Sequence, residues 1–148
     1  MRASRAFVGL TVRALGQVGT DVTLPQFRAL VVLASRGSLR SVDIAEELQV
    51  NPSTGTRMTD RLAAKGLVRR VRSTDDRRVV RLRLTRAGKE IVERVMDQRR
   101  TALERIVAET AAVWRPEVTE ALTAFAQAAG EMPEQDWWLG WSGVADEV

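Results

Sequence analysis

The stretch between residues 51 and 85 constrains the fold most, because its apolar pattern changes from a helical period to a strand period. Asn51 and the proline after it predict a helix start, since an Asn side chain accepts from unpaired backbone N–H groups and Pro fits the first helical position. Gly66 is the expected C-cap. Two segments, 67–71 and 79–84, then alternate apolar and basic residues. The stretch therefore predicts a helix followed by a β-hairpin.

A second short helix is expected just before this one. Ile44, Ala45 and Leu48 share one face at helical spacing, and only Gln49 and Val50 separate them from the next helix start. Two short helices joined by so short a turn form a helix-turn-helix. A β-hairpin directly after it makes the pattern that of a winged helix.

An earlier helix is marked by its cap. Thr23 and Gln26 stand three residues apart, as in a capping box, and an apolar stripe beginning with Phe27 ends at Gly37. After the hairpin, Thr85 is the expected N-cap of a long helix.

Positive charge is concentrated around the hairpin. Residues 57–86 hold eleven Arg or Lys against three acids, a net charge of +8 in a protein whose total is +4. Such a field on a helix and a hairpin suits duplex DNA, although a charge cluster by itself is more often a solvated face.

The start of the second helix carries short hydroxyls and a long cation, which suit hydrogen bonding to base edges in a major groove. The residues expected to contact DNA from this helix are Ser53, Thr54, Thr56, Arg57 and Arg61. Met58 and Leu62 are expected to face the core. Gly55 either permits a close approach of the backbone to DNA or has no role there.

Two further motifs resemble a known family. The junction Lys65-Gly66-Leu67-Val68 and the pattern Asp76-x-Arg78-x-x-x-Leu82-x-Leu84-Thr85 are similar to the wing of MarR-type transcriptional regulators. The likeness runs from residue 23 to about residue 88. It implies an obligate homodimer whose two recognition helices occupy successive major grooves of a near-palindromic operator.

The resemblance also implies roles for the wing. Arg78 would enter the minor groove beside the major-groove site, where negative potential is concentrated, and Asp76 would orient it. Arg77 belongs to the same expected DNA contacts, and Ser38, Arg40 and Arg72 are the expected phosphate contacts. The alternative for Asp76 and Arg78 is a surface ion pair that stabilises the turn.

The flanking segments read as helices. The predicted fold is mainly α with a small β-hairpin wing (α+β), in which a winged helix-turn-helix at 23–85 is flanked by N-terminal (1–20) and C-terminal (86–130) dimerisation helices. A tail at 131–148 completes one structural domain, as the length of 148 residues permits. In the C-terminal helices, Arg99 and Arg100 are expected to face outward and Pro116 to interrupt the helix. The alternative to intertwining with a second subunit is a helical hairpin within one chain.

Several residue types are missing. Without Cys, the thiol-based peroxide switch of some MarR-type relatives is excluded, and without His the usual zinc or copper ligands are gone. No cofactor, metal or catalytic group is expected, so an enzyme is not predicted. No apolar run approaches the roughly 20 residues of a membrane span and no signal peptide is evident, so the cytoplasm is the expected location.

The predicted function is sequence-specific transcriptional regulation, as a homodimeric repressor bound to double-stranded DNA and released by a small amphipathic or aromatic effector. The resemblance implies an effector crevice between the winged helix and the dimerisation helices. Its residues are unknown, and Phe7, Phe27 and Trp114 are guesses that fit a core equally well. Two alternatives stay open, an architectural DNA-binding protein with weak sequence preference and a winged helix that binds another protein.

The segment 131–148 differs from the rest. It holds five acids, no base, and Trp137, Trp138 and Trp141. Large exposed apolar groups usually have a partner. The tryptophans are expected to fold back on the dimer helices, and the alternatives are a lid on the effector crevice or a docking site for another protein.

Overall fold

The computed structural model describes residues 2–72, 78–133 and 136. Its elements are α1 (Arg2–Val18), α2 (Leu24–Arg36), α3 (Ser41–Glu47), α4 (Pro52–Ala64), β1 (Val68–Arg72), β2 (Val80–Leu84), α5 (Arg86–Glu109), the 3-10 turn η1 (Ala111–Val113) and α6 (Pro116–Ala128). The order confirms the predicted mainly helical fold with one hairpin. Each predicted strand begins one residue later than expected.

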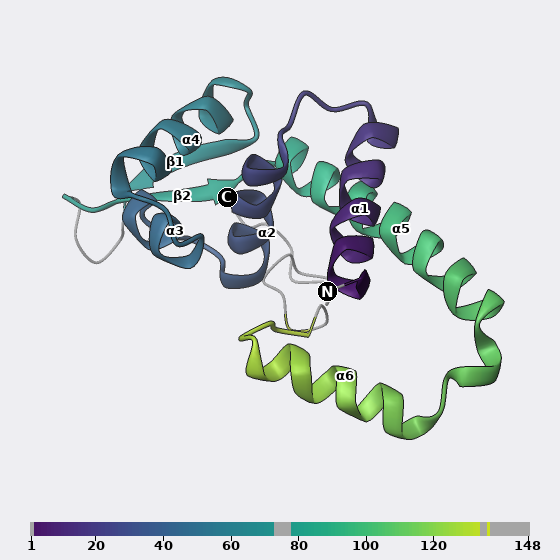
Figure 1. The fold of residues 1–148 in the computed structure, drawn as a ribbon. Coiled ribbons are helices and arrows are strands. Elements are labelled where there is room, and N and C mark those ends of the chain that lie inside the picture. The colour runs from purple at the N-terminus through teal and green to yellow at the C-terminus, as the bar shows by residue number, and fades with distance from the viewer. Residues whose placement is uncertain (1, 73–77, 134–135, 137–148) are drawn as a thin grey trace.

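The core lies inside the winged helix. Helices α2, α3 and α4, the hairpin and the first half of α5 surround it (Figure 1), and α1 adds Ala14 and Leu15 to the same cluster. Each of the four helices α2, α3, α4 and α5 contributes at least one side chain that is at most 2% exposed, namely Phe27, Leu30, Ile44, Leu62 and Val95. Burial of such side chains is the main force that holds the elements together.

The predicted caps of α2 and α5 are confirmed. Thr23 Oγ1 accepts from the Gln26 backbone N–H at 3.4 Å, and Gln26 Oε1 accepts from the Thr23 N–H at 3.1 Å. Gly37 follows α2 with a φ of 79°. Thr85 Oγ1 accepts from the Gly88 N–H at 3.1 Å and starts α5.

The ends of α4 differ in detail from the prediction. Among the described residues the Asn51 side chain makes no cap hydrogen bond. The Asn51 carbonyl instead accepts from Thr54 N at 2.9 Å, so the N–H that the side chain would have capped is already bonded. The C-cap is Lys65, and Gly66 lies one position later with a φ of 69°. Gly66 N bonds to Ala63 O and the next N–H to Leu62 O, which is a Schellman motif.

The hairpin pairs β1 with β2 in antiparallel register, with Val68 opposite Leu84 and Arg72 opposite Val80. The other edge of β2 is also paired, because Leu82 exchanges two backbone hydrogen bonds with Leu39, at 2.7 and 3.2 Å. The chain before α3 therefore holds the hairpin in place, a pairing that the local sequence pattern did not predict.

The flanking helices form an arm beside the winged helix (Figure 1). Helix α1 packs along α5 and buries Leu10, Ala14 and Leu15 within the same chain. The other side leaves Phe7 and Val8 exposed. Helix α6 has no buried residue. A helix that crosses a membrane needs about 20 apolar residues, and none of the described helices meets that requirement.

Candidate nucleic-acid interface

Helix α4 and the hairpin lie together at the end of the molecule opposite α6 (Figure 1). Along α4, Met58, Thr59 and Leu62 are buried, while Ser53, Thr56, Arg57 and Arg61 are exposed. These are four of the five positions on α4 that were predicted to contact DNA. The helix therefore presents hydroxyls and guanidinium groups on the face opposite the core.

Two threonines on α4 are less available than the sequence indicated. Thr54 is half-buried, since it lies next to the buried Gly55. The Thr56 hydroxyl donates to Pro52 O at 3.0 Å, so its lone pairs remain to accept from a donor such as a base amino group. On the first turns of α4, Arg57 is the exposed side chain that carries several hydrogen-bond donors.

Gly55 has a role that does not involve nucleic acid. It is buried against α3, where an added methyl group would lie 2.6 Å from Ala45 Cβ and 3.1 Å from the Ser41 carbonyl. The absence of a side chain lets the two helices of the helix-turn-helix approach closely. The close approach that the structure shows is to α3, which neither of the two explanations left open by the sequence had named.

The turn between α3 and α4 depends on Gln49, whose φ is 55° in the left-handed region. The residues around it bond back into α3, with Gln49 N to Glu46 O at 3.0 Å and Val50 N to Ala45 O at 2.9 Å. These bonds fix the direction in which α4 leaves the turn. Because Gln49 is not a glycine, the sequence did not predict a left-handed backbone at this position.

An ion pair ties the hairpin to α4. Arg70 on β1 donates to the Asp60 carboxylate on α4, and both side chains are about half exposed. Asp60 is the one acid on the described face of α4, so Arg70 offsets a negative charge among the cations there. The two residues are ten apart on different elements, which is why no helical or strand period indicated the pair.

The start of α3 is held by Arg40 and Asp43. The Asp43 carboxylate accepts from the Arg40 backbone N–H at 2.9 Å and from Arg40 Nε at 3.0 Å. The hydrogen bond from the Arg40 side chain lowers the pKa of Asp43 below its ordinary 3.8, against the opposing effect of burial, and it raises the pKa of Arg40. Arg40, an expected phosphate contact, is therefore already paired with an acid but remains half exposed.

The other expected phosphate contacts lie between α2 and α3 and on the hairpin. Ser38 is half-buried, and its carbonyl accepts from Arg81 Nη1 at 3.1 Å. Arg81 thus stabilises the packing of the hairpin against the chain before α3. Arg72 is exposed at the end of β1.

Of the predicted wing contacts, Arg78 is described and exposed. Asp76 and Arg77 lie outside the described residues. The expected orientation of Arg78 by Asp76 therefore stays a prediction.

The residues guessed for an effector pocket do not come together. Phe27 is 2% exposed in the core, whereas Phe7 and Trp114 are partly exposed on α1 and after η1. The predicted outward direction of Arg99 is also wrong, because this side chain is half-buried along a groove on α5. Within the described ranges, no three acidic, His or Cys side chains gather as metal ligands.

Comparison with known proteins agrees with this arrangement. The model of the MarR family matches residues 22–80. The transcriptional repressor MdtR of Bacillus subtilis is 42% identical over 84 residues, which cover 57% of this chain and 54% of MdtR. This chain thus spans about half the length of the curated relatives it matches.

Solved structures cover more of the chain. RV1404 from Mycobacterium tuberculosis is 38% identical with a TM-score of 0.84, over 89% of this chain and 90% of that one. A MarR family protein from Bacillus stearothermophilus is 26% identical with a TM-score of 0.71, over 87% of this chain and 86% of that one. With a family model on the winged helix and a relative aligned over nine-tenths of its length, the chain belongs to the MarR family of transcriptional regulators.

Proposed function

We propose that this protein is a homodimeric repressor that binds double-stranded DNA at a near-palindromic operator. The observation that carries the proposal is the exposed row on α4, where Ser53, Thr56 and Arg57 stand on the first turns of a helix whose opposite face is buried. Side chains of this kind at a helix start discriminate base edges in the major groove.

The hairpin would extend the contact beyond the major groove. Arg78 is exposed next to the turn, and Arg72 lies at the end of the paired strand. A cation inserted into a narrow minor groove and another on the phosphates would add affinity that falls with salt. The net charge of +8 over residues 57–86 supports this part of the proposal.

Dimerisation is supported by apolar surface outside the winged helix. On α6, Val118, Leu122 and Phe125 share one helix face and are 38%, 42% and 73% exposed. On α1, Phe7 and Val8 are about half exposed. Apolar surface of this extent normally meets a partner, and a second copy of the chain would pair these faces by two-fold symmetry.

Repression is proposed because MdtR, which is 42% identical over 84 residues, is named a transcriptional repressor. Release by a small amphipathic or aromatic effector completes the proposal. Because α5 runs unbroken from the hairpin into the arm, an effector that prefers one packing of the arm would favour one spacing of the two α4 helices.

Selection of bound sequences from a random duplex library at physiological salt tests the proposal. Enrichment of an inverted repeat with half-sites about one helical turn apart is expected. Binding without enrichment would indicate an architectural protein instead. No binding would overturn the DNA-binding function and favour a winged helix that binds protein.

A further inference from the structure

Lys65 links the end of α4 to the segment that enters α2. It is the C-cap residue of α4, and its ammonium group donates to the Asp21 backbone carbonyl. The same group lies 3.2 Å from the Asp21 carboxylate and 3.3 Å from Gln26 Oε1. A lysine ammonium group has three N–H donors and no acceptor, so these oxygens match its full capacity. The contacts join residues that are 39 and 44 positions apart in the sequence.

The acceptors around Lys65 are themselves held in place. Gln26 is 6% exposed, and its Oε1 also accepts from the Thr23 N–H at 3.1 Å in the capping box of α2. Val22, the residue after Asp21, is buried in the core. The Asp21 carboxylate is fully exposed, so its ion pair with Lys65 contributes little. The link therefore depends on the Asp21 carbonyl and the Gln26 side chain.

The same end of α4 is also bonded to α5. Thr85 Oγ1, at the N-cap of α5, donates to Gly66 O at 2.7 Å, and Thr85 N donates to Leu67 O at 3.1 Å. Gly88, on the first turn of α5, lies so close to the Leu67 carbonyl that there is no room for a Cβ. Helices α1 and α5 pack on each other in the arm (Figure 1). The end of α4 is thus bonded to the start of α5 directly and, through Lys65, to the connection that follows α1.

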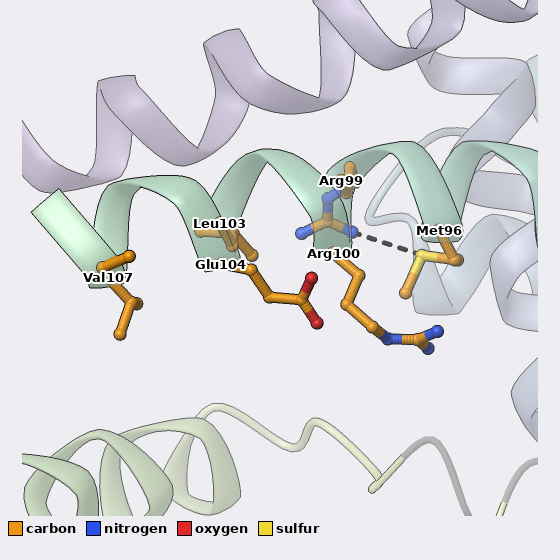
Figure 2. A pocket seen from close by; sticks show the side chains of 7 residues that line it. Met96, Arg99, Arg100, Leu103, Glu104 and Val107 are labelled. Atoms are coloured by element: carbon orange, nitrogen blue, oxygen red, sulfur yellow. Dashed lines mark hydrogen bonds between the residues drawn. The ribbon is translucent and has the colours of Figure 1, made fainter.

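Two cations within the arm make contacts of a different kind. On α5, Arg99 Nη1 lies 3.4 Å from Met96 Sδ (Figure 2), and Arg100 Nη1 lies 3.0 Å from the Asp97 carboxylate. Each pair joins two residues of one helix, so it cannot resist a movement of one element against another. Lys65 joins α4 to a different segment, and a hydrogen bond from an ionised donor is roughly twice as strong as a neutral one.

We propose that Lys65 is a positioning residue, which holds the end of α4 at one angle to the connection between α1 and α2. The inference rests on the proposed DNA-binding function, because the angle of α4 decides how far apart two copies of this helix lie in a dimer. Without the ammonium group, the end of α4 adopts a wider range of angles. Lys65 thereby restricts the half-site spacing that the protein accepts, and its donors act within the protein and not on the bases.

Duplexes that differ only in half-site spacing test the consequence for DNA. Lys65→Met should lower the ratio of affinities for the preferred spacing and for a spacing altered by a single base pair at least about threefold. Lys65→Arg keeps a long donor and should retain most of the wild-type ratio. Lys89→Met removes the other lysine, on α5, and should leave the ratio unchanged. A variant that only lost stability would bind every duplex less by the same factor, so an unchanged ratio in Lys65→Met would overturn the proposal.

A measurement without DNA separates this inference from the proposed function. The protein has no Cys, so Gln17→Cys on α1 and Arg61→Cys on α4, both at exposed positions, introduce the only two thiols for spin labels. Pulsed EPR on labelled chains mixed with an excess of unlabelled protein gives the distribution of distances between α1 and α4. Lys65→Met should widen this distribution at least twofold, and Lys89→Met should not.

The two measurements fail in different ways. A distribution of unchanged width in Lys65→Met would overturn the positioning role, whatever the DNA results. If the wild-type protein shows no preferred half-site spacing while Lys65→Met widens the distribution, the proposed operator binding is wrong and the positioning of α4 by Lys65 stands.

Discussion

Gly55 and Ala45 are in such close contact that a methyl group on Gly55 would lie 2.6 Å from Ala45 Cβ, well inside the normal separation of two carbons. The backbones of α3 and α4 therefore meet with no side chain from α4 between them. The position of α4 depends on this contact.

Gly55→Ala should destabilise the protein by about 1–2 kcal/mol. Overpacking costs about 1–3 kcal/mol, and the better helix propensity of Ala returns up to about 1 kcal/mol of it. Gly16→Ala on α1 is the matched control, because nothing lies within 4 Å of the added methyl group. Gly16→Ala should raise the free energy of unfolding, measured by urea denaturation, by up to about 1 kcal/mol. Equal effects of the two changes would contradict the packing argument.

Arg57→Ala should relax base preference. An Arg that reads a base edge contributes about 1–3 kcal/mol of discrimination, so the ratio of operator to random-DNA affinity should fall roughly 5- to 150-fold. Competition binding with the selected operator measures that ratio. Arg28→Ala, an exposed cation on α2 outside the candidate interface, is the control for lost charge. If both variants lower the ratio equally, Arg57 does not read bases.

Arg78→Ala should act differently. Loss of this cation should weaken binding to all sequences and lower the slope of log affinity against log salt by about 1 for each subunit. Titrations at four salt concentrations give the slope. Wild-type affinity at every salt concentration would show that the hairpin stays away from DNA.

Phe125→Glu should convert the dimer to monomers. Phe125 is 73% exposed on α6 and would occur twice in a symmetric interface. Loss of about 1.5–3 kcal/mol at each copy raises the dimer Kd at least about a hundredfold. Gln127→Glu adds the same charge elsewhere on α6, where it is also exposed, and should leave the dimer intact. Sedimentation velocity distinguishes the outcomes, and a dimeric Phe125→Glu variant would exclude this face of α6 from the interface.

The pair of Asp43 and Arg40 should make stability depend on acid pH. The pKa of Asp43 is lower in the folded protein than its ordinary 3.8, so the unfolded chain takes up the proton first as pH falls. The contribution is complete above about pH 4 and is lost as pH falls through the folded-state pKa. Asp43→Asn should therefore be less stable than wild type at pH 7, with a difference that shrinks toward pH 3. A difference independent of pH would contradict a role for the carboxylate charge.

Local features of the fold were readable from the sequence. The capping box of Thr23 and Gln26, the cap at Thr85 and the buried face of α4 follow from residues a few positions apart. The sequence did not predict the pairing of Leu39 with Leu82 or the ion pair between Asp60 and Arg70. Each of these contacts joins distant segments and depends on how the elements pack. Gln49 escaped notice because its left-handed backbone is imposed by the surrounding turn.

The candidate site was predicted more completely than the arm. The exposure of Arg57 follows from the helical period, since its neighbour Met58 must face the core. The half-buried position of Arg99 does not follow from that period, because the apolar pattern of α5 is interrupted near this residue.

The length of α5 has a mechanical consequence. A 24-residue helix is about 36 Å long, and a rod of that length converts a tilt of about 5° at one end into a displacement of about 3 Å at the other. One base pair occupies about 3.4 Å of duplex. In the proposed homodimer, a slight rotation in the arm would thus be enough to move each α4 by about one base-pair step. The operator length preferred by such a dimer would accordingly be a property of its arm as much as of its winged helix.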